Sequence, residues 1–186
     1  MTTALAKPLQ PDEWGMLQAL ATTIFESHLF PSASSPSAAA AIMLTGRDLG
    51  VGYAAALQGI TMIKNKVTIS PALAWGIITA SGQLEDWNIG DLTDAKGNAT
   101  GCLVTMKRLH GNSYSVLYTV EDAARAGLVK PDSNWISYPA NMCRWRAIGF
   151  CADILFPDLL FGIRRYDELG GNITPDGEII FEEAAA

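Results

Sequence analysis

Apolar residues recur every three to four positions through residues 12–58, which is the spacing of helices that each bury one face. This pattern predicts helices over 12–29 and 38–49, and a further helical turn or two over 53–58. Between the first two lies PSASSPS (31–37), whose prolines and serines indicate a linker. The second helix is expected to stop at Gly50 or Gly52, because glycine commonly ends helices.

The period changes after residue 58. Two short β-branched runs, 61–63 and 67–69, surround Lys64-Asn65-Lys66, which predicts a hairpin with a basic tip. Ser70-Pro71 then has the chemistry of a helix start, because serine caps free N–H groups and proline suits the first helical position. We expect this helix to run over 72–80.

Residues 84–119 have the pattern of an antiparallel meander. The predicted strands are Trp87–Leu92, Cys102–Leu109 and Tyr114–Tyr118, separated by TDAKGN and HGN. The Asn, Asp and Gly residues of these two turns favour hairpins. The sequence therefore predicts a small antiparallel sheet.

Two helices are predicted after the sheet. Thr119-x-x-Asp122 resembles a capping box for a short helix ending at Gly127. Pro139 opens the longest late helix, and Pro157 ends or kinks it. One face of this helix is formed by Met142, Trp145, Gly149, Ala152 and Phe156. The sum is an α+β fold, a small antiparallel sheet with a β-hairpin packed against several helices.

Charge divides the chain into three expected parts. Residues 1–36, an N-terminal helix and linker, sum to −2, and residues 37–165, the central body, sum to +2. Residues 166–186 contribute the remaining −6 and are expected to form a loosely held acidic tail. The net charge of −6 therefore does not oppose a polyanionic partner, because binding depends on how charge is distributed.

Composition excludes several classes of protein. With 49% hydrophobic and 17% charged residues, the chain is not mainly disordered. No window approaches the ~20 unbroken apolar residues of a membrane span. The start MTTALAKPLQPDEW lacks the basic flank and apolar run of a signal peptide. Cys102, Cys143 and Cys151 form no close pair, so a disulfide framework and a zinc site are not expected, and a cytoplasmic location fits.

Two other kinds of chemistry are weighed. GRDLGVG (46–52) precedes no G-K-[S/T], so it is interpreted as a helix stop and turn, and ATP is not expected. Asp86, Asp91 and Asp94 surround a strand and a turn. They are interpreted as exposed turn acids, and the alternative is a small metal-dependent nuclease or hydrolase that uses them.

Basic residues with aromatic neighbours are the most informative group, since such surfaces hold single strands without reading their sequence. They are Lys64, Lys66, Lys107, Arg108, Trp135, Tyr138, Arg144, Trp145, Arg146, Arg164 and Arg165. Trp145 lies on the apolar helix face and is interpreted as core. Arg144 and Arg146 differ by ~200° around a helix. We therefore do not expect Arg144 and Arg146 to lie on one DNA-binding face of the helix. One of the two is expected to pair with Asp153 or with another neighbour.

Three stretches together resemble the phage RecT/Redβ-type (Bet) single-strand annealing recombinases. GRDLGVGYAAALQGITMIKNKVTISPALAWGIITASG (46–82) is similar to the group's helix ending in G-R-E-L-G, its V-I-x-G-K hairpin and its I-S helix start. YTVEDAARAGLV (118–129) is similar to F-T-x-E-D-A-x-x-A-G-L. NWISYPANMCRWRAIGFCADILFPDLLFGI (134–163) is similar to W-x-x-Y-P-x-x-M-L-x-x-R-A-x-x-x-x-x-R-x-x-F-P-D. The order and spacing also agree.

The resemblance implies a non-catalytic, ATP-independent protein of homologous recombination that binds single-stranded DNA and anneals complementary strands, with residues 37–165 as its DNA-binding and annealing core. It implies homo-oligomeric rings or helical filaments, a phage 5′–3′ exonuclease and a host single-strand binding protein as partners, and a bacterial cytoplasm as location. Magnesium is considered only as a modulator of annealing. Carried over by position, the implied DNA-binding residues include Arg47, Lys64, Lys66, Arg125 and Arg146.

Three positions depart from the group's pattern. Asn65 replaces the hairpin glycine, Cys143 replaces a leucine, and Asp153 stands where an arginine is usual, which removes one expected phosphate contact. Besides the nuclease, a non-catalytic phage assembly protein with an acidic tail remains an alternative.

Overall fold

The computed structural model describes residues 8–63 and 66–181. The chain divides into two compact units. One contains the described residues up to Val67 together with Phe181, and the other runs over Thr68–Ile180. This division falls inside a strand, whereas the sequence predicted boundaries after residues 36 and 165. The two units are described separately below.

The first unit begins with three helices, α1 (Pro11–Ser27), α2 (Pro36–Asp48) and α3 (Tyr53–Gly59). The Ser35 side chain accepts a hydrogen bond from the Ala38 N–H and caps α2. A Cβ on Gly46 would lie 2.4 Å from that of Ala56, so α2 and α3 approach closely only because Gly46 has no side chain. The three predicted helices and the turn at 49–52 are confirmed.

The predicted hairpin is confirmed in its two strands, β1 (Ile60–Ile63) and β2 (Lys66–Ile69), which are hydrogen-bonded neighbours. Its predicted tip residues Lys64 and Asn65 lie outside the described residues. Within the second unit, Thr68 and Ile69 pair in parallel with β6 (Arg164–Arg165), a strand that the sequence did not predict.

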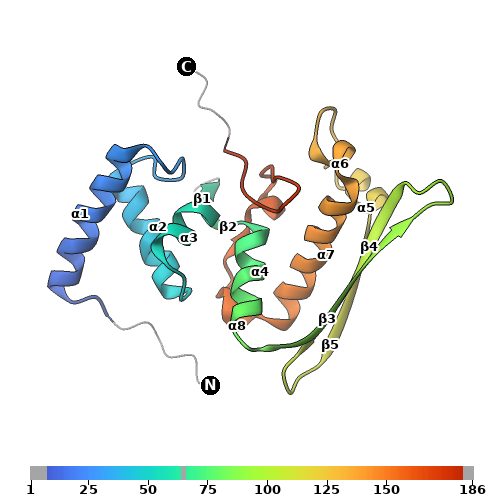
Figure 1. Cartoon of the computed structure of the whole chain (residues 1–186), viewed down its shortest axis with the longest axis horizontal. Helices are drawn as coiled ribbons and strands as arrows, with labels where there is room; N and C mark the ends of the chain where they lie inside the picture. Colours follow the sequence, from blue (N-terminus) through green and yellow to red (C-terminus); the bar gives the residue numbers. More distant parts are fainter. Residues whose placement is uncertain (1–7, 64–65, 182–186) are drawn as a thin grey trace. The chain divides into compact units, whose positions relative to one another are not determined.

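The second unit contains a three-stranded antiparallel sheet in the order β3-β4-β5, formed by Leu84–Thr93, Ala99–Arg108 and Ser113–Thr119. In the central strand Cys102, Val104 and Met106 are buried, whereas Leu103 is 42% exposed. The buried row faces α7 (Pro139–Leu155), which lies across one face of the sheet with α4 (Pro71–Ala80) beside it (Figure 1). The predicted meander and the α+β class are therefore confirmed.

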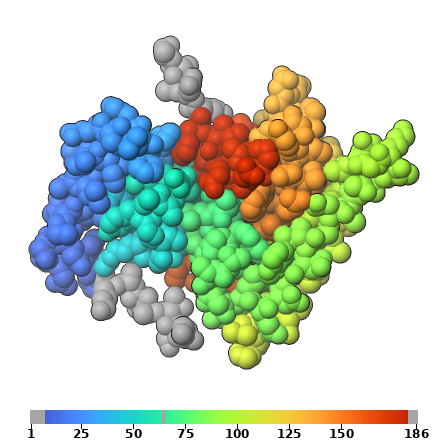
Figure 2. Space-filling view, viewed as in Figure 1, coloured from blue at the N-terminus to red at the C-terminus, as the bar shows by residue number. Residues whose placement is uncertain are grey.

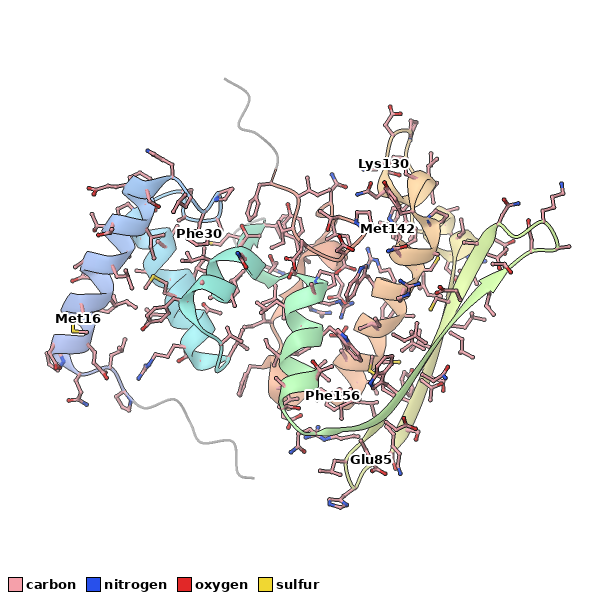
Figure 3. The ribbon with its side chains drawn as sticks, viewed as in Figure 1. Met16, Phe30, Glu85, Lys130, Met142 and Phe156 are labelled. Atoms are coloured by element: carbon pink, nitrogen blue, oxygen red, sulfur yellow. The ribbon has the colours of Figure 1, made fainter. Side chains whose placement is uncertain are left out.

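Local signals explain where the helices of this unit begin and end. Ser70 caps α4 by accepting the Leu73 N–H at 3.0 Å. Thr119 and Asp122 form the predicted capping box of α5 (Val120–Arg125). A short helix α6 (Asn134–Ser137) precedes α7, and Pro157 ends α7 and starts α8 (Pro157–Leu160). Met142 and Phe156, near the two ends of α7, are both buried (Figure 3).

The expectation of a loosely held tail is wrong for residues 166–181. After β6, a 3₁₀ turn η1 (Tyr166–Leu169) leads to a bridge between Ile173 and Ile179, and both isoleucines are buried. The indole Nε1 of Trp145 donates to the Pro175 carbonyl at 2.9 Å. Figure 2 shows this segment, in red, packed against the orange α6–α7 region.

None of the helices in residues 8–63 and 66–181 is long and apolar enough to cross a membrane.

Candidate nucleic-acid interface

Lys66 is the first residue of β2, and its side chain is exposed. Thr68 and Ile69, two and three residues further along the strand, are buried and pair with β6, so the strand is anchored shortly after the lysine. Lys64, the other predicted hairpin cation, lies outside the described residues. Arg47 is half-buried in the last turn of α2, where a cation opposes the negative end of the helix dipole.

Arg108 connects the end of β4 to the corner between α7 and α8. Its guanidinium donates to both carboxylate oxygens of Asp158 at 2.6 Å and to the Leu155 carbonyl at 2.7 Å, and it lies over the Phe156 ring. This hydrogen bonding lowers the pKa of Asp158. The stretch Phe156-Pro157-Asp158, which is part of the RecT-type resemblance, therefore contacts Arg108, a predicted DNA-binding residue.

Lys107 and Arg125 form ion pairs on the surface. Lys107 pairs with Glu85 near the start of β3, and Arg125 pairs with Asp122 one helical turn away. The Arg125 side chain is 74% exposed, so solvent screens its pair and the guanidinium stays accessible.

Arg144 and Arg146 diverge around α7, as their spacing predicts. Arg144 donates to Asp91 of β3 at 2.6 Å. Arg146 donates to the Asp167 backbone carbonyl at 2.7 Å, and its Nε lies 3.2 Å from the Asp167 carboxylate. Only 10% of the Arg146 side chain is exposed. Arg146 is a core residue in this structure, which differs from the DNA contact that the resemblance implies.

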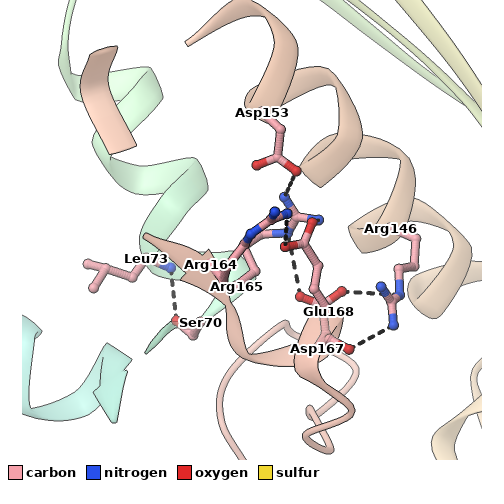
Figure 4. Close-up of polar contacts among 8 residues, drawn as sticks. All are labelled: Ser70, Leu73, Arg146, Asp153, Arg164, Arg165, Asp167 and Glu168. Atoms are coloured by element: carbon pink, nitrogen blue, oxygen red, sulfur yellow. Dashed lines mark hydrogen bonds and ion pairs between the residues drawn. The ribbon is translucent and has the colours of Figure 1, made fainter. Parts of the chain in front are cut away.

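Arg146 belongs to a buried cluster of charges between α7 and the segment that follows it (Figure 4). At its centre Arg165, 1% exposed, donates to Asp153 at 2.9 Å and to Glu168 at 2.5 Å. Its Nε also lies 3.5 Å from the Asp167 carboxylate. Asp153, which stands where the RecT-type pattern has an arginine, therefore pairs with an arginine from elsewhere in the chain.

Burial of this cluster changes the pKa of Glu168, and its packing depends on the absence of a side chain at Gly149. Removal of Glu168 from water raises its pKa to about 7, although Arg165 opposes that shift. Gly149 leaves the space that the Arg165 guanidinium occupies, because a Cβ at this position would lie 2.0 Å from the Arg165 Cζ. Sequence reasoning noted Arg165 only as part of a basic run, since two of its acidic partners, Asp167 and Glu168, lie in a segment interpreted as a tail.

Aromatic side chains gather where β5 meets α6 and α7. The Tyr118 ring lies 6.1 Å from that of Trp135 and 5.9 Å from that of Phe150, measured between ring centroids. Tyr138, immediately before α7, is 49% exposed. The sequence singled out Trp135 and Tyr138 but missed Tyr118 and Phe150, because only tertiary packing brings these two together.

The three acids of the nuclease alternative have separate roles. Asp86 accepts the Trp87 N–H at 2.8 Å, Asp91 pairs with Arg144, and Asp94 accepts the N–H groups of Lys96 and Asn98 in the β3–β4 turn. In the described part of the chain, no group of three His, Cys, Asp or Glu residues is placed to hold a metal ion. The structure therefore does not assemble these acids into one site.

The predicted DNA-binding residues differ in how exposed their side chains are. Of those that the structure describes, Lys66, Arg125 and Tyr138 are exposed, Arg146 is buried, and the others are partly buried, namely Arg47, Lys107, Arg108, Trp135 and Arg144. A comparison with protein-family models and one with curated proteins each find no match to this chain.

Proposed function

We propose that this chain binds single-stranded DNA and anneals complementary strands without ATP, with Lys64 and Lys66 as its main phosphate-binding residues. The observation that carries the proposal is the hairpin, in which exposed Lys66 begins a strand whose last two residues, Thr68 and Ile69, are buried and paired with β6. An anchored strand holds a cation at a fixed position, which lowers the entropic cost of binding a phosphate.

The order of the elements supports the proposal. The first stretch of the RecT-type resemblance forms the end of α2, then α3, the strands of the hairpin and the capped start of α4. The second stretch forms the end of β5 and α5, and the third forms α6, α7 and α8. These are the helix end, hairpin and helix starts that the resemblance implies, in the same order.

The mechanism needs no catalytic residue. The hairpin lysines neutralise phosphates of one strand, and exposed Tyr138 offers a ring on which a base stacks. Base edges remain free for the complementary strand, and base pairing supplies the free energy of annealing. Each phosphate neutralised contributes about −0.7 to the slope of log K against log salt on a single strand.

Assembly is part of the proposal. A few phosphate contacts per chain give weak binding, and several copies on one strand raise the effective affinity. We therefore propose homo-oligomeric rings or helical filaments. A phage 5′–3′ exonuclease would supply the strand, a host single-strand binding protein would share it, and magnesium would modulate annealing.

The test compares two double variants that remove the same charge. Lys64→Ala/Lys66→Ala removes the hairpin lysines, and Lys96→Ala/Lys130→Ala removes two exposed lysines from loops of the second unit. Binding to a fluorescent oligonucleotide by anisotropy, and annealing of two labelled complementary oligonucleotides without ATP, are measured over a range of salt. We expect the hairpin variant alone to lose about tenfold or more in affinity, which corresponds to about 1.4 kcal/mol for the two phosphate contacts together.

Two results would contradict the proposal. If the wild-type chain neither shifts the anisotropy nor speeds annealing, the function is wrong. If both double variants weaken binding equally, the chain binds DNA through its overall charge and the hairpin assignment is wrong.

A further inference from the structure

The two edges of the β3-β4-β5 sheet differ in their protection against pairing with another strand. The β3 edge carries three acids, Glu85, Asp86 and Asp91, and has register shifts near both ends. The β5 edge, Ser113–Thr119, has no charged residue, no proline and no register shift against β4. Charges and bulges are the usual means of blocking an open edge, so β5 is left open to another strand.

The backbone of β5 offers hydrogen-bonding groups along this edge. The Arg108 N–H donates to the Asn112 carbonyl, so Arg108 and Asn112 form a hydrogen-bonded pair of the ladder. Hydrogen-bonded and non-hydrogen-bonded pairs alternate in an antiparallel ladder, so the backbone groups of Tyr114 and Val116 bond to β4. Ser115 and Leu117 then direct their N–H and C=O groups outward. Both residues are exposed, and among the described residues no backbone bond from outside the ladder reaches them.

The sequence of β5 is complementary to itself in the antiparallel direction. Centred on Val116, an antiparallel copy places Tyr114 opposite Tyr118 and Ser113 opposite Thr119. It also places Ser115 opposite Leu117, and these are the residues whose backbone groups face outward. This register pairs tyrosine with tyrosine and hydroxyl with hydroxyl, and it aligns the outward backbone groups of Ser115 with those of Leu117.

Exposed apolar side chains flank this edge on both faces of the sheet. On the helix side, Phe150 and Ile154, one turn apart on α7, are 39% and 58% exposed. On the other side, Leu117 of the edge strand itself is 53% exposed, whereas its partner Leu103 lies one strand further from the edge. A second sheet joined at β5 would remove apolar surface from water on both faces.

We propose that β5 pairs with β5 of a second copy of this chain, in an antiparallel ladder centred on Val116 that joins two three-stranded sheets into one. The contact is twofold and closed, so it adds no further copies by itself. It differs from the repeating contact of a ring or filament, and it does not depend on DNA binding.

Cross-linking tests the register. Antiparallel residues of a non-hydrogen-bonded pair have Cα atoms about 4.5 Å apart, within the range that a disulfide spans. In the proposed dimer two Val116→Cys side chains meet at the twofold axis, whereas Leu103→Cys, on the central strand, stays away from it. Cys102, Cys143 and Cys151 are buried, so the wild-type chain gives a low background.

After mild oxidation we expect most of the Val116→Cys chain to run as a dimer on a non-reducing gel. Leu103→Cys should run as the wild type does. If Val116→Cys stays monomeric, or cross-links no more than Leu103→Cys, the proposed register is wrong.

Sedimentation of reduced protein tests the interface without new cysteines. Leu117→Lys places a charge at the edge, and Leu103→Lys places the same charge on the same face of the central strand. We expect wild type and Leu103→Lys to contain a species of twice the 19.9 kDa of one chain, and Leu117→Lys to lose it. A monomeric wild type, or two variants that sediment alike, would overturn the proposal.

Discussion

The two sides of α7 use the same kind of side chain in different ways. Arg144 pairs with Asp91 at a partly exposed position, where 32% and 38% of the two side chains are exposed. Arg146 pairs with Asp167, and those side chains are 10% and 5% exposed. Solvent screens the first pair, whereas loss of one partner from the second leaves a buried charge without compensation. The position of an arginine around the helix therefore decides how strongly the fold depends on it.

The largest expected effect is that of Arg146→Ala, which leaves the Asp167 carboxylate with only Arg165 nearby. We expect it to lower the free energy of unfolding by about 3 kcal/mol. The matched change Arg144→Ala should cost less than about 1 kcal/mol, because its pair is partly exposed. Urea unfolding followed by circular dichroism measures both. Equal losses would remove the distinction between the two sides of the helix.

Gly149→Ala tests the same buried side without removing a charge. Its new methyl group collides with the Arg165 guanidinium, which is held by Asp153 and Glu168, so we expect a loss of about 2 kcal/mol from overpacking. Gly76→Ala, in α4, has no atom within 4 Å of its new Cβ and should gain about 0.5–1 kcal/mol from helix propensity. Thermal unfolding of both variants should show opposite shifts, and a Gly149→Ala that gains stability would refute the steric argument.

Glu168, on the buried side of α7, makes the free energy of unfolding depend on pH. Burial raises the pKa of Glu168 from 4.5 to about 7, so the folded chain holds a proton there that the unfolded chain has released. Stability that depends on this proton falls as the pH rises from about 4.5 to 7, by at most about 1.4 kcal/mol per pH unit.

The variant Glu168→Gln cannot titrate, so its unfolding free energy should depend less on pH over that window than that of the wild type. Urea titrations at matched pH values measure the difference between the two curves. Parallel curves would show that Glu168 does not titrate differently in the folded and unfolded chains.

The smallest expected effect concerns the exposed side of α7. If Arg144 leaves Asp91 to contact one phosphate, Arg144→Gln should make the slope of log K against log salt less steep by about 0.7. Anisotropy with a labelled oligonucleotide measures this slope. An unchanged slope would place Arg144 with Arg146 among the structural arginines.

Most of the fold follows from local sequence signals. The prolines, serines and threonines at helix starts, the apolar periods and the Asn/Gly turns predict the three meander strands and the helices around them. These signals act within a few residues of each other, which is why sequence reasoning finds them. The hairpin strands are likewise confirmed, and the DNA-binding role of the hairpin stays a prediction.

The part that sequence reasoning missed depends on distant contacts. Residues 166–181 have helix breakers and acids, a composition typical of tails, yet Asp167 pairs with Arg146 of α7, just as Arg165, shortly before this segment, pairs with Asp153 of α7. Tyr118 and Phe150 meet only because β5 lies beside α7. Charge counts place −6 in the terminal part, but they do not show which of those charges face a buried arginine.

The packing of residues 165–179 also affects the order in which the chain folds during synthesis. The helix-facing row of β4 is made well before α7, and Arg165 and Ile179 are made later still. At about 5–20 residues per second, the roughly 60 residues between β5 and Ile179 take some 3–12 seconds to synthesise. Until the end of that interval the chain lacks the segment that packs against Trp145 and pairs with Arg146, so a nascent chain passes through a stage in which this side of α7 is uncovered. Chaperones that bind such surfaces would meet this chain at that stage.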